Sequence, residues 1–214
     1  MKDLLNKFSI FDFIAILLSG TCICTIMLLT LYFVYNIKFS ISLGIDNNIL
    51  FFVVSYLLGI IFQELGAFLY NKIIFKNDML LRRTLNLKLK NTLLSVDEKK
   101  SVYRYFKKKH NVLDERTIYN YCKIYVFNKY KKQEHDRGIS LSAMSRSLSV
   151  YSFMTFITMI VLLFFEISNI NYTYLYIFLI LLPLLSLIFF VRYLYFTNNR
   201  YANILHTFYY DNIV

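Results

Sequence analysis

The sequence predicts an all-α membrane protein with four transmembrane helices in two hairpins and a helical cytosolic domain between spans two and three. The first observation is compositional: 57% of the 214 residues are hydrophobic and 17% are charged, whereas ordinary globular domains carry about 25% charged residues. The second is positional, because the charged residues stand in blocks between four long apolar runs. A soluble core does not need uninterrupted runs of that length, so the bilayer is the simpler solvent for them.

The four apolar runs are the predicted spans. A helix needs ~20 predominantly apolar residues to cross the hydrocarbon core. Runs of about this length cover residues 11–35, 49–70, 150–165 and 174–196. The first run is longer than the roughly 7–15 apolar residues of a secretory signal, and no small-x-small cleavage site follows it. We therefore expect it to remain in the protein as a span.

The connectors between the runs define the predicted layout. Residues 37–48 and 166–171 are short polar loops, and each joins two spans into a hairpin. The predicted domains are a first transmembrane hairpin at 1–71, a basic helical cytosolic domain at 72–149, a second transmembrane hairpin at 150–196 and a cytosolic C-terminal tail at 197–214.

The distribution of Lys and Arg predicts the orientation. Of 24 such residues, the two short loops hold one, Lys38. Because basic residues concentrate in cytoplasmic loops, both termini and the middle segment are predicted to face the cytosol. Heavy use of Ile, Lys, Asn, Tyr and Phe is typical of an AT-rich genome and favours a bacterium. The predicted location is the bacterial inner (cell) membrane, as a multi-pass protein.

The middle segment carries the excess charge, with 19 Lys and Arg against 7 Asp and Glu between residues 72 and 146. Ser95 and Glu98 have the spacing of a capping box and predict a helix that runs to about His110. Asp114 suits the cap of a further helix. Gly138 suits a C-cap or a hinge, and residues 139–148 place their apolar side chains on one helical face that leads into span three.

Basic and aromatic residues alternate along these helices. Cations offset phosphate charge, and aromatic rings stack on bases at ~1–3 kcal/mol each, so the pattern suits a nucleotide or a short single-stranded oligonucleotide. The interleaved rings are Tyr103, Tyr105, Phe106, Tyr119, Tyr121, Tyr125 and Tyr130. The predicted ligand-binding residues are Lys100, Arg104, Lys107, Lys108, Lys109, Arg116, Lys123, Lys129, Arg137 and Arg146. Two alternatives remain: contact with anionic lipid, at ~1 kcal/mol per residue, or a merely solvated face.

Three polar residues at membrane depth are the predicted pore or gating residues: Glu64, its neighbour Gln63, and Arg192. An ionisable group inside a span needs a partner or water, which makes it a functional candidate. The alternative is that Glu64 and Arg192 pair between the hairpins and fix helix packing. Gly59 and Gly66 permit close helix approach in span two. Hydroxyls in spans one and three could line water or bond to their own helices.

The sequence does not favour catalysis. It has no Gly-rich phosphate loop, no metal-spaced His/Cys cluster and no H-E-x-x-H motif. The three cysteines, Cys22, Cys24 and Cys122, are expected to be reduced packing residues. We therefore expect no enzyme activity, no cofactor and no metal site.

The layout of the whole chain resembles the membrane effectors of bacterial nucleotide-signalling anti-phage systems. The resemblance rests on two hairpins around a basic segment, with basic-aromatic helices at 99–110 and 114–132 and the approach 137–146 to span three. These effectors include small two-span and four-span proteins found beside nucleotidyltransferases. The chain is similar in layout to the channel subunit of the Hailong system, which responds to a DNA oligomer. The resemblance implies a homo-oligomeric ion channel whose cytosolic domains bind an oligonucleotide and control opening, which depolarises the infected cell.

Two hypotheses from different classes follow. The first is a homo-oligomeric, ligand-gated channel in anti-phage defence, in which phosphates bound to the basic helices bias helices that continue into the spans. The second is a non-conducting membrane scaffold that holds a cytosolic partner or anionic lipid. Both need the lipid bilayer as a partner.

Overall fold

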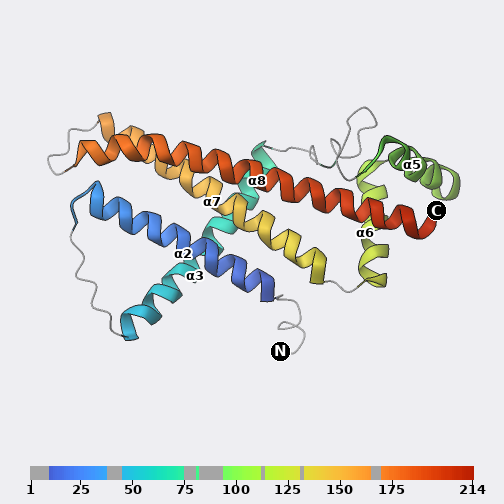
Figure 1. Ribbon diagram of the computed structural model, residues 1–214, viewed down its shortest axis with the longest axis horizontal. Coiled ribbons are helices and arrows are strands. Elements are labelled where there is room, and N and C mark those ends of the chain that lie inside the picture. Colours follow the sequence, from blue (N-terminus) through green and yellow to red (C-terminus); the bar gives the residue numbers. More distant parts are fainter. Residues whose placement is uncertain are drawn as a thin grey trace. The chain divides into compact units, whose positions relative to one another are not determined.

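The structure, a computed structural model, describes residues 10–37, 45–74, 81, 94–111, 114–130, 133–164 and 170–214. Every regular element within these ranges is helical. The elements are α2 (Ile10–Phe33), α3 (Ile45–Phe68), a π-helical segment η1 (Leu69–Ile74) that continues α3, α5 (Val96–His110), α6 (Glu115–Lys129), α7 (Gln133–Phe164) and α8 (Tyr172–Asn212) (Figure 1).

Four of these helices, α2, α3, α7 and α8, are long and apolar enough to cross a membrane. The prediction of an all-helical chain with four long apolar runs is confirmed at this level. Two helices extend well beyond their predicted spans: α7 begins at Gln133 and α8 continues to Asn212. Gly138 therefore lies inside α7, so the prediction of a C-cap there is wrong, whereas a hinge at this residue stays a prediction. The run 139–148 is helical as expected.

The chain divides into two compact units. Unit 1 contains Met1–Leu69 and Ser140–Tyr193, and unit 2 contains Tyr70–Ile139 and Leu194–Val214. Both α7 and α8 contribute residues to both units. The C-terminal residues that the sequence analysis treated as a separate tail are thus helical and belong to unit 2 from Leu194 onward.

Unit 1 is built on a close crossing of α2 and α3 (Figure 1). A Cβ atom added to Gly20 would collide with the backbone carbonyl of Ser55, and one added to Gly59 would collide with that of Ile16. Without a hydrophobic force between helices in lipid, close backbone approach through small residues supplies the van der Waals contact instead. The sequence analysis identified Gly59 but missed Gly20, its counterpart on the facing helix.

Helix α7 packs against both α3 and α8 within unit 1. Ser149 and Ser186 exchange hydrogen bonds, each hydroxyl donating to the other residue's carbonyl at 3.0 Å. On the α3 side, a Cβ at Gly66 would lie 3.2 Å from Cγ of Arg146. Gly66 therefore allows the close approach that the sequence suggested, and Arg146 is the residue that uses it.

Unit 2 has an apolar core formed by α5, α6 and the C-terminal part of α8. Its buried residues include Val102 and Phe106 of α5, Ile118 and Cys122 of α6, and Phe208 of α8. Both predicted N-caps are confirmed. Ser95 and Glu98 form the full capping box of α5, and Asp114 accepts from the Thr117 amide at the start of α6.

Candidate functional site

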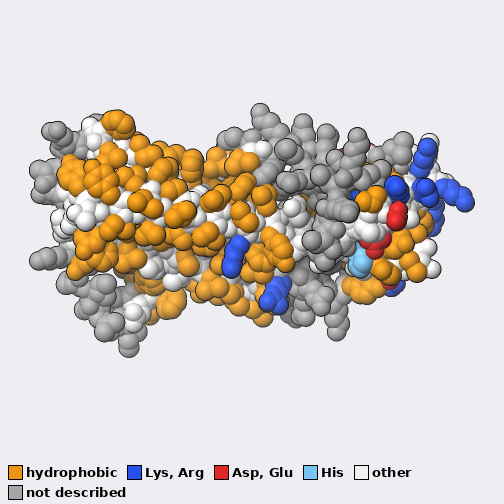
Figure 2. Space-filling view, turned by 45° about the horizontal axis from the view of Figure 1, so that its top comes forward, with side chains coloured by type: hydrophobic (Ala, Val, Ile, Leu, Met, Phe, Trp, Pro, Cys, Tyr) orange, Lys and Arg blue, Asp and Glu red, His pale blue; other side chains and the backbone are white. Residues whose placement is uncertain are grey.

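One side of α5 presents four cations to solvent. Lys100, Arg104, Lys107 and Lys108 are all exposed, and their three- and four-residue spacing places them on one helical face. We call these four residues the cationic face, and Figure 2 shows Lys and Arg side chains gathered over this helix. The face is about 12 Å long at 1.5 Å per residue.

Lys99 lies on the opposite side of α5. It is buried, and the loss of hydration lowers the pKa of its ammonium group. Lys99 therefore belongs to the interior of unit 2 and does not extend the cationic face.

The described acidic residues of unit 2 mostly serve other groups. Glu98 bonds to the Ser95 amide and to His206, and Asp211 bonds to Lys129 and Tyr130. In the part of the chain that the structure describes, no ion pair involves a residue of the cationic face. Its charge is therefore available for an external anion.

Two more carboxylates, those of Asp114 and Glu115, interact with other groups and do not neutralise the cationic face. Asp114 accepts from Thr117, and Glu115 accepts from the Tyr103 hydroxyl. Burial, together with the nearby Glu115 and Asp114 charges, raises the pKa of Tyr103. Tyr103 is half-buried against this acidic pair, which places its hydroxyl away from a phosphate-binding role.

The structure corrects the expected role of several aromatic residues. Phe106 is 1% exposed and Tyr119 is 7% exposed. Phe106 stacks on Phe208 with ring centroids 5.3 Å apart, and Tyr119 meets Tyr201 edge-on at 5.0 Å. These rings form the core of unit 2, so the expectation that they stack on bases is wrong. Burial of an aromatic side chain removes a large apolar area from solvent, which favours its place in a core.

One ring pair remains exposed beside the cationic face. His110, the last residue of α5, stacks on Tyr121 of α6 with centroids 5.5 Å apart and planes inclined by 19°. Both side chains are exposed, Tyr121 by 48%. Because His110 lies three residues after Lys107, the pair adjoins the cationic face. The sequence analysis included Tyr121 among its rings, but not the pairing with His110.

The remaining predicted cations of unit 2 are less available. Lys109 donates to the Tyr105 hydroxyl at 2.8 Å. Lys123 lies over the Phe127 ring, 5.5 Å from its centroid. Lys129 donates to Tyr125 and pairs with Asp211 at 3.1 Å. Hydrogen bonds to Asp211 and Tyr125 raise the pKa of Lys129.

Three predicted ligand-binding residues lie elsewhere. Arg116 is exposed on the flank of α6, and Arg137 is exposed near the start of α7. Arg146 belongs to unit 1, where its Nη2 donates to the Gln63 carbonyl at 3.4 Å. The structure thus brings the four residues of the cationic face together and assigns Arg146 to helix packing.

Two polar clamps join α8 to the other helices of unit 2. His206 lies 3.1 Å from Glu98 at the start of α5. Asp211 accepts from Tyr130 at 2.8 Å and pairs with Lys129 at the end of α6. No local sequence pattern predicts these clamps, because their members are up to 108 residues apart.

The predicted pore or gating residues all belong to unit 1. Glu64 of α3 and Arg192 of α8 are exposed, and Gln63 is half-buried. Among the residues that the structure describes, neither charged group enters an ion pair. The proposed Glu64–Arg192 pair within one chain is therefore wrong. Both charged side chains are exposed, and each lies in the apolar part of its helix.

Hydroxyl groups in α2 and α7 mostly bond to their own helices. Thr21, Thr25, Thr155 and Thr158 each donate to the carbonyl four residues earlier, at 2.8–3.0 Å. This pattern satisfies the hydroxyl inside an apolar environment. It favours the second of the two interpretations drawn from the sequence, in which these groups do not line water.

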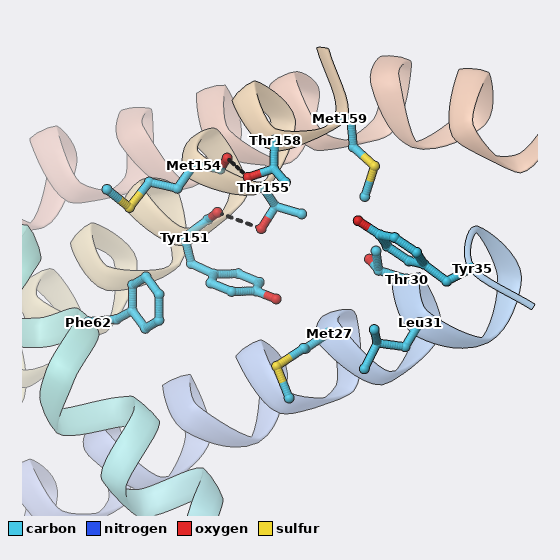
Figure 3. Close-up of a pocket in the computed structure, with 10 residues that line it drawn as sticks. All are labelled: Met27, Thr30, Leu31, Tyr35, Phe62, Tyr151, Met154, Thr155, Thr158 and Met159. Atoms are coloured by element: carbon cyan, nitrogen blue, oxygen red, sulfur yellow. Dashed lines mark hydrogen bonds between the residues drawn. The ribbon is translucent and has the colours of Figure 1, made fainter. Parts of the chain in front are cut away.

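Unit 1 also contains a cavity of about 260 Å³ between α2, α3 and α7 (Figure 3). The rings of Tyr35 and Tyr151 project toward it, and its other lining side chains are those of methionine, threonine, leucine and phenylalanine residues. The Tyr151 ring meets Phe62 edge-on at 5.0 Å. The buried Thr30 hydroxyl at its wall has no hydrogen-bond partner among the residues that the structure describes.

The described residues contain no group of three His, Cys, Asp or Glu side chains that could hold a metal ion. Cys24 and Cys122 are buried free thiols, as expected, whereas Cys22 is exposed on α2. In comparisons with known proteins, no family model, curated protein or solved structure matches this chain.

Proposed function

We propose that this chain is the subunit of a homo-oligomeric membrane effector in bacterial anti-phage defence. In this proposal unit 2 faces the cytosol and binds a nucleotide or a short single-stranded oligonucleotide. The bound ligand controls ion flow through the membrane-spanning helices. The single observation that carries the proposal is the cationic face of α5, whose four exposed cations have no acidic partner among the described residues.

The dimensions of the face favour a short oligonucleotide. Stacked nucleotides rise by about 3.4 Å each, so the 12 Å face suits about three to four of them. The exposed His110–Tyr121 pair at its end offers a ring surface on which a terminal base can stack. A simple inorganic anion would need the charges but not the rings.

The helices of unit 2 provide a route for coupling. Helix α8 runs without a break from Tyr172 to Asn212, so one helix carries both a candidate span and the clamps at His206 and Asp211. Ligand that shifts α5 or α6 changes the contacts of α8 in the same unit. A ligand controls conduction in this way only if it binds one conformation more tightly than the other.

The test is a recording from the purified chain in planar bilayers, with and without a short single-stranded DNA. We expect ligand to change conductance in the unmodified protein. Replacing Lys107→Glu together with Lys108→Glu should abolish that response and leave the protein in the membrane, because two repulsive charges then meet the phosphates. The matched control, Lys107→Arg with Lys108→Arg, keeps the charge and should keep the response.

The outcomes separate the candidate functions. A response that survives the double reversal contradicts ligand binding at the cationic face. No conductance in any condition favours the alternative, a non-conducting scaffold that holds a partner or anionic lipid. In that case the same four cations should bind vesicles that contain phosphatidylserine, at ~1 kcal/mol per residue.

A further inference from the structure

The four candidate spans are unequally covered within one chain. In their most apolar stretches, 39% of the residues of α2 and of α7 are buried, but only 17% of those of α3 and of α8. Helices α2 and α7 therefore form the inner part of unit 1. Helices α3 and α8 leave most of their surface to whatever surrounds a single chain.

The uncovered side of α3 is an apolar stripe with one charge. Residues at helical spacing along it are exposed by 50% or more: Leu50, Val53, Leu57, Ile61 and Phe68. Glu64 lies on the same stripe, between Ile61 and Phe68, because the spacing of three and four residues continues through it. Lipid satisfies the apolar side chains but not the carboxylate.

The uncovered side of α8 is also an apolar stripe with one charged residue, but here the charge is positive. Its exposed apolar residues at helical spacing are Ile177, Leu181, Leu184, Ile188 and Tyr195. Arg192 lies between the last two of these on the same stripe. Each of the two least covered spans thus carries one charged residue on its open face, and the two charges are complementary.

Helix α7 shows that the two charges lie at similar depth. Gly66 of α3 packs on Arg146, and Ser186 of α8 bonds to Ser149. Because α3 and α8 both run antiparallel to α7, these two contacts align α3 with α8. In this alignment the levels of Glu64 and Arg192 differ by about five residues, or roughly 8 Å along the helix axis. Helical side chains tilt toward the N-terminus, and the N-termini of α3 and α8 lie on the same side. The Arg192 side chain is longer than that of Glu64 and extends further in this direction, which reduces the offset.

We propose that α3 of one copy of this chain packs against α8 of a second copy, with Glu64 of one copy paired to Arg192 of the other. This contact joins two different surfaces, so repetition by rotation about the membrane normal closes a ring in which every copy is equivalent. The inference rests on the homo-oligomer of the proposed function and adds the faces and residues that assemble it. It also explains why the pair does not form within one chain.

A charge-reversal series tests the pairing. We expect Glu64→Arg and Arg192→Glu, each alone, to weaken association of copies in vesicles by about tenfold or more, because like charges then meet in a poorly hydrated interface. The double variant restores the pair with its direction exchanged and should associate within about threefold of the unmodified chain. Energy transfer between labelled copies during dilution with lipid measures the association.

Cross-linking tests the same contact without changing the charges. In a chain whose three native cysteines are replaced by Ala, Ile61→Cys and Ile188→Cys lie one turn from Glu64 and Arg192. We expect mild oxidation to link one copy to the next. The matched control pairs Ile188→Cys with Leu18→Cys, which is 49% exposed on α2. The control should remain uncross-linked.

The results distinguish failure of this inference from failure of the proposed function. If the unmodified chain associates and both single reversals associate equally well, the α3–α8 contact is wrong. That result does not contradict the proposed oligomeric channel. If Leu18 cross-links as well as Ile61, the assigned face is wrong. If the unmodified chain remains a monomer in vesicles that conduct ions, both the contact and the oligomeric channel fail.

Discussion

In unit 1 the buried residues along α2 include the small residues Ala15, Ser19 and Gly20, whereas many of its large apolar side chains, such as Leu18 and Leu29, are exposed. In unit 2 the large rings of Phe106 and Phe208 are buried, and the exposed positions of α5 carry Lys and Arg. The difference is the one expected between helices in lipid and a unit in water. Water drives large apolar side chains inward, but lipid does not, and helices in lipid associate through close backbone contact.

The two units also treat polar groups differently. In unit 1 most described threonine hydroxyls of α2 and α7 bond to carbonyls of their own helix, and the Ser149–Ser186 contact between α7 and α8 uses uncharged groups. In unit 2 polar side chains bond between helices, as Glu98 does with His206 and Asp211 with Lys129. One chain therefore contains two kinds of packing, and the effect of a substitution should depend on the unit that contains it.

The largest expected effect concerns the thiol of Cys122 in the core of unit 2. Cys122 is fully buried, and burial raises its pKa to about 12 from an ordinary value of 9.0. Since the thiolate is the reactive form, its fraction at pH 8 falls roughly a thousandfold. We expect a charged maleimide to leave Cys122 of the folded chain unlabelled, in a variant that lacks Cys22 and Cys24. Mass spectrometry measures the labelling, and complete labelling in detergent-denatured protein is the control.

Phe106→Ala should selectively destabilise unit 2. The ring is 1% exposed and stacks on Phe208, and removing a buried Phe typically costs about 3–5 kcal/mol. We expect Cys122 to become reactive in this variant, while the protein still fractionates with the membrane. Tyr121→Ala removes an exposed ring and is the matched control, which should leave Cys122 protected. Equal labelling of the two variants would contradict the assignment of Phe106 to the core.

Periodicity and capping chemistry predicted much of this fold from the sequence. The apolar runs fixed four long helices, and the Ser95–Glu98 and Asp114 signatures fixed the starts of α5 and α6. These signals are local, so a single sequence contains them in full. Helices α7 and α8 extend beyond the predicted spans, because polar residues such as Arg146 of α7 and Asn198 of α8 end an apolar run without ending the helix.

The candidate site was less predictable than the fold. The face that contains Lys100, Arg104, Lys107 and Lys108 followed from helical spacing alone. Whether an aromatic residue forms part of a core or of a binding surface depends on what the other helices bring to it. Phe208 belongs to the C-terminal residues that were expected to form a polar tail. Its ring stacks on Phe106 in the core of unit 2.

Gly20→Ala should weaken unit 1 by a smaller but distinct amount. The added Cβ would collide with the Ser55 carbonyl, and overpacking typically costs about 1–3 kcal/mol. We expect earlier thermal unfolding in detergent, followed by size-exclusion chromatography, without exposure of Cys122. The matched control is Gly138→Ala: nothing lies within 4 Å of its added Cβ, and Ala in a helix interior is more stable than Gly by about 0.5–1 kcal/mol. A Gly20 variant as stable as the Gly138 variant would contradict the close crossing.

The smallest effect concerns the clamp formed by Asp211, Lys129 and Tyr130. Partial desolvation opposes ionisation of Asp211, but hydrogen bonds from Tyr130 and Lys129 outweigh it, so its pKa is lowered. A carboxyl group with a lowered folded pKa contributes stability above its unfolded pKa and loses it as the pH falls through the folded pKa. Lys129 has a raised pKa and contributes below the unfolded value of 10.5. The clamp should therefore act between about pH 4 and pH 10.

Asp211→Asn tests this window. We expect the variant to unfold at slightly lower temperature than the unmodified chain at pH 7, and the gap to shrink as the pH falls below 3.8 and through the lowered pKa of Asp211, because the carboxyl group then becomes protonated in both states. Exposed ion pairs contribute little, so the shift should be well below that of Phe106→Ala. Tyr130→Phe removes a donor to the same carboxylate and should add almost nothing in the Asp211→Asn background, since the two changes remove one interaction. A gap that keeps its full size as the pH falls through the acid range would show that Asp211 acts through its packing and not through its charge.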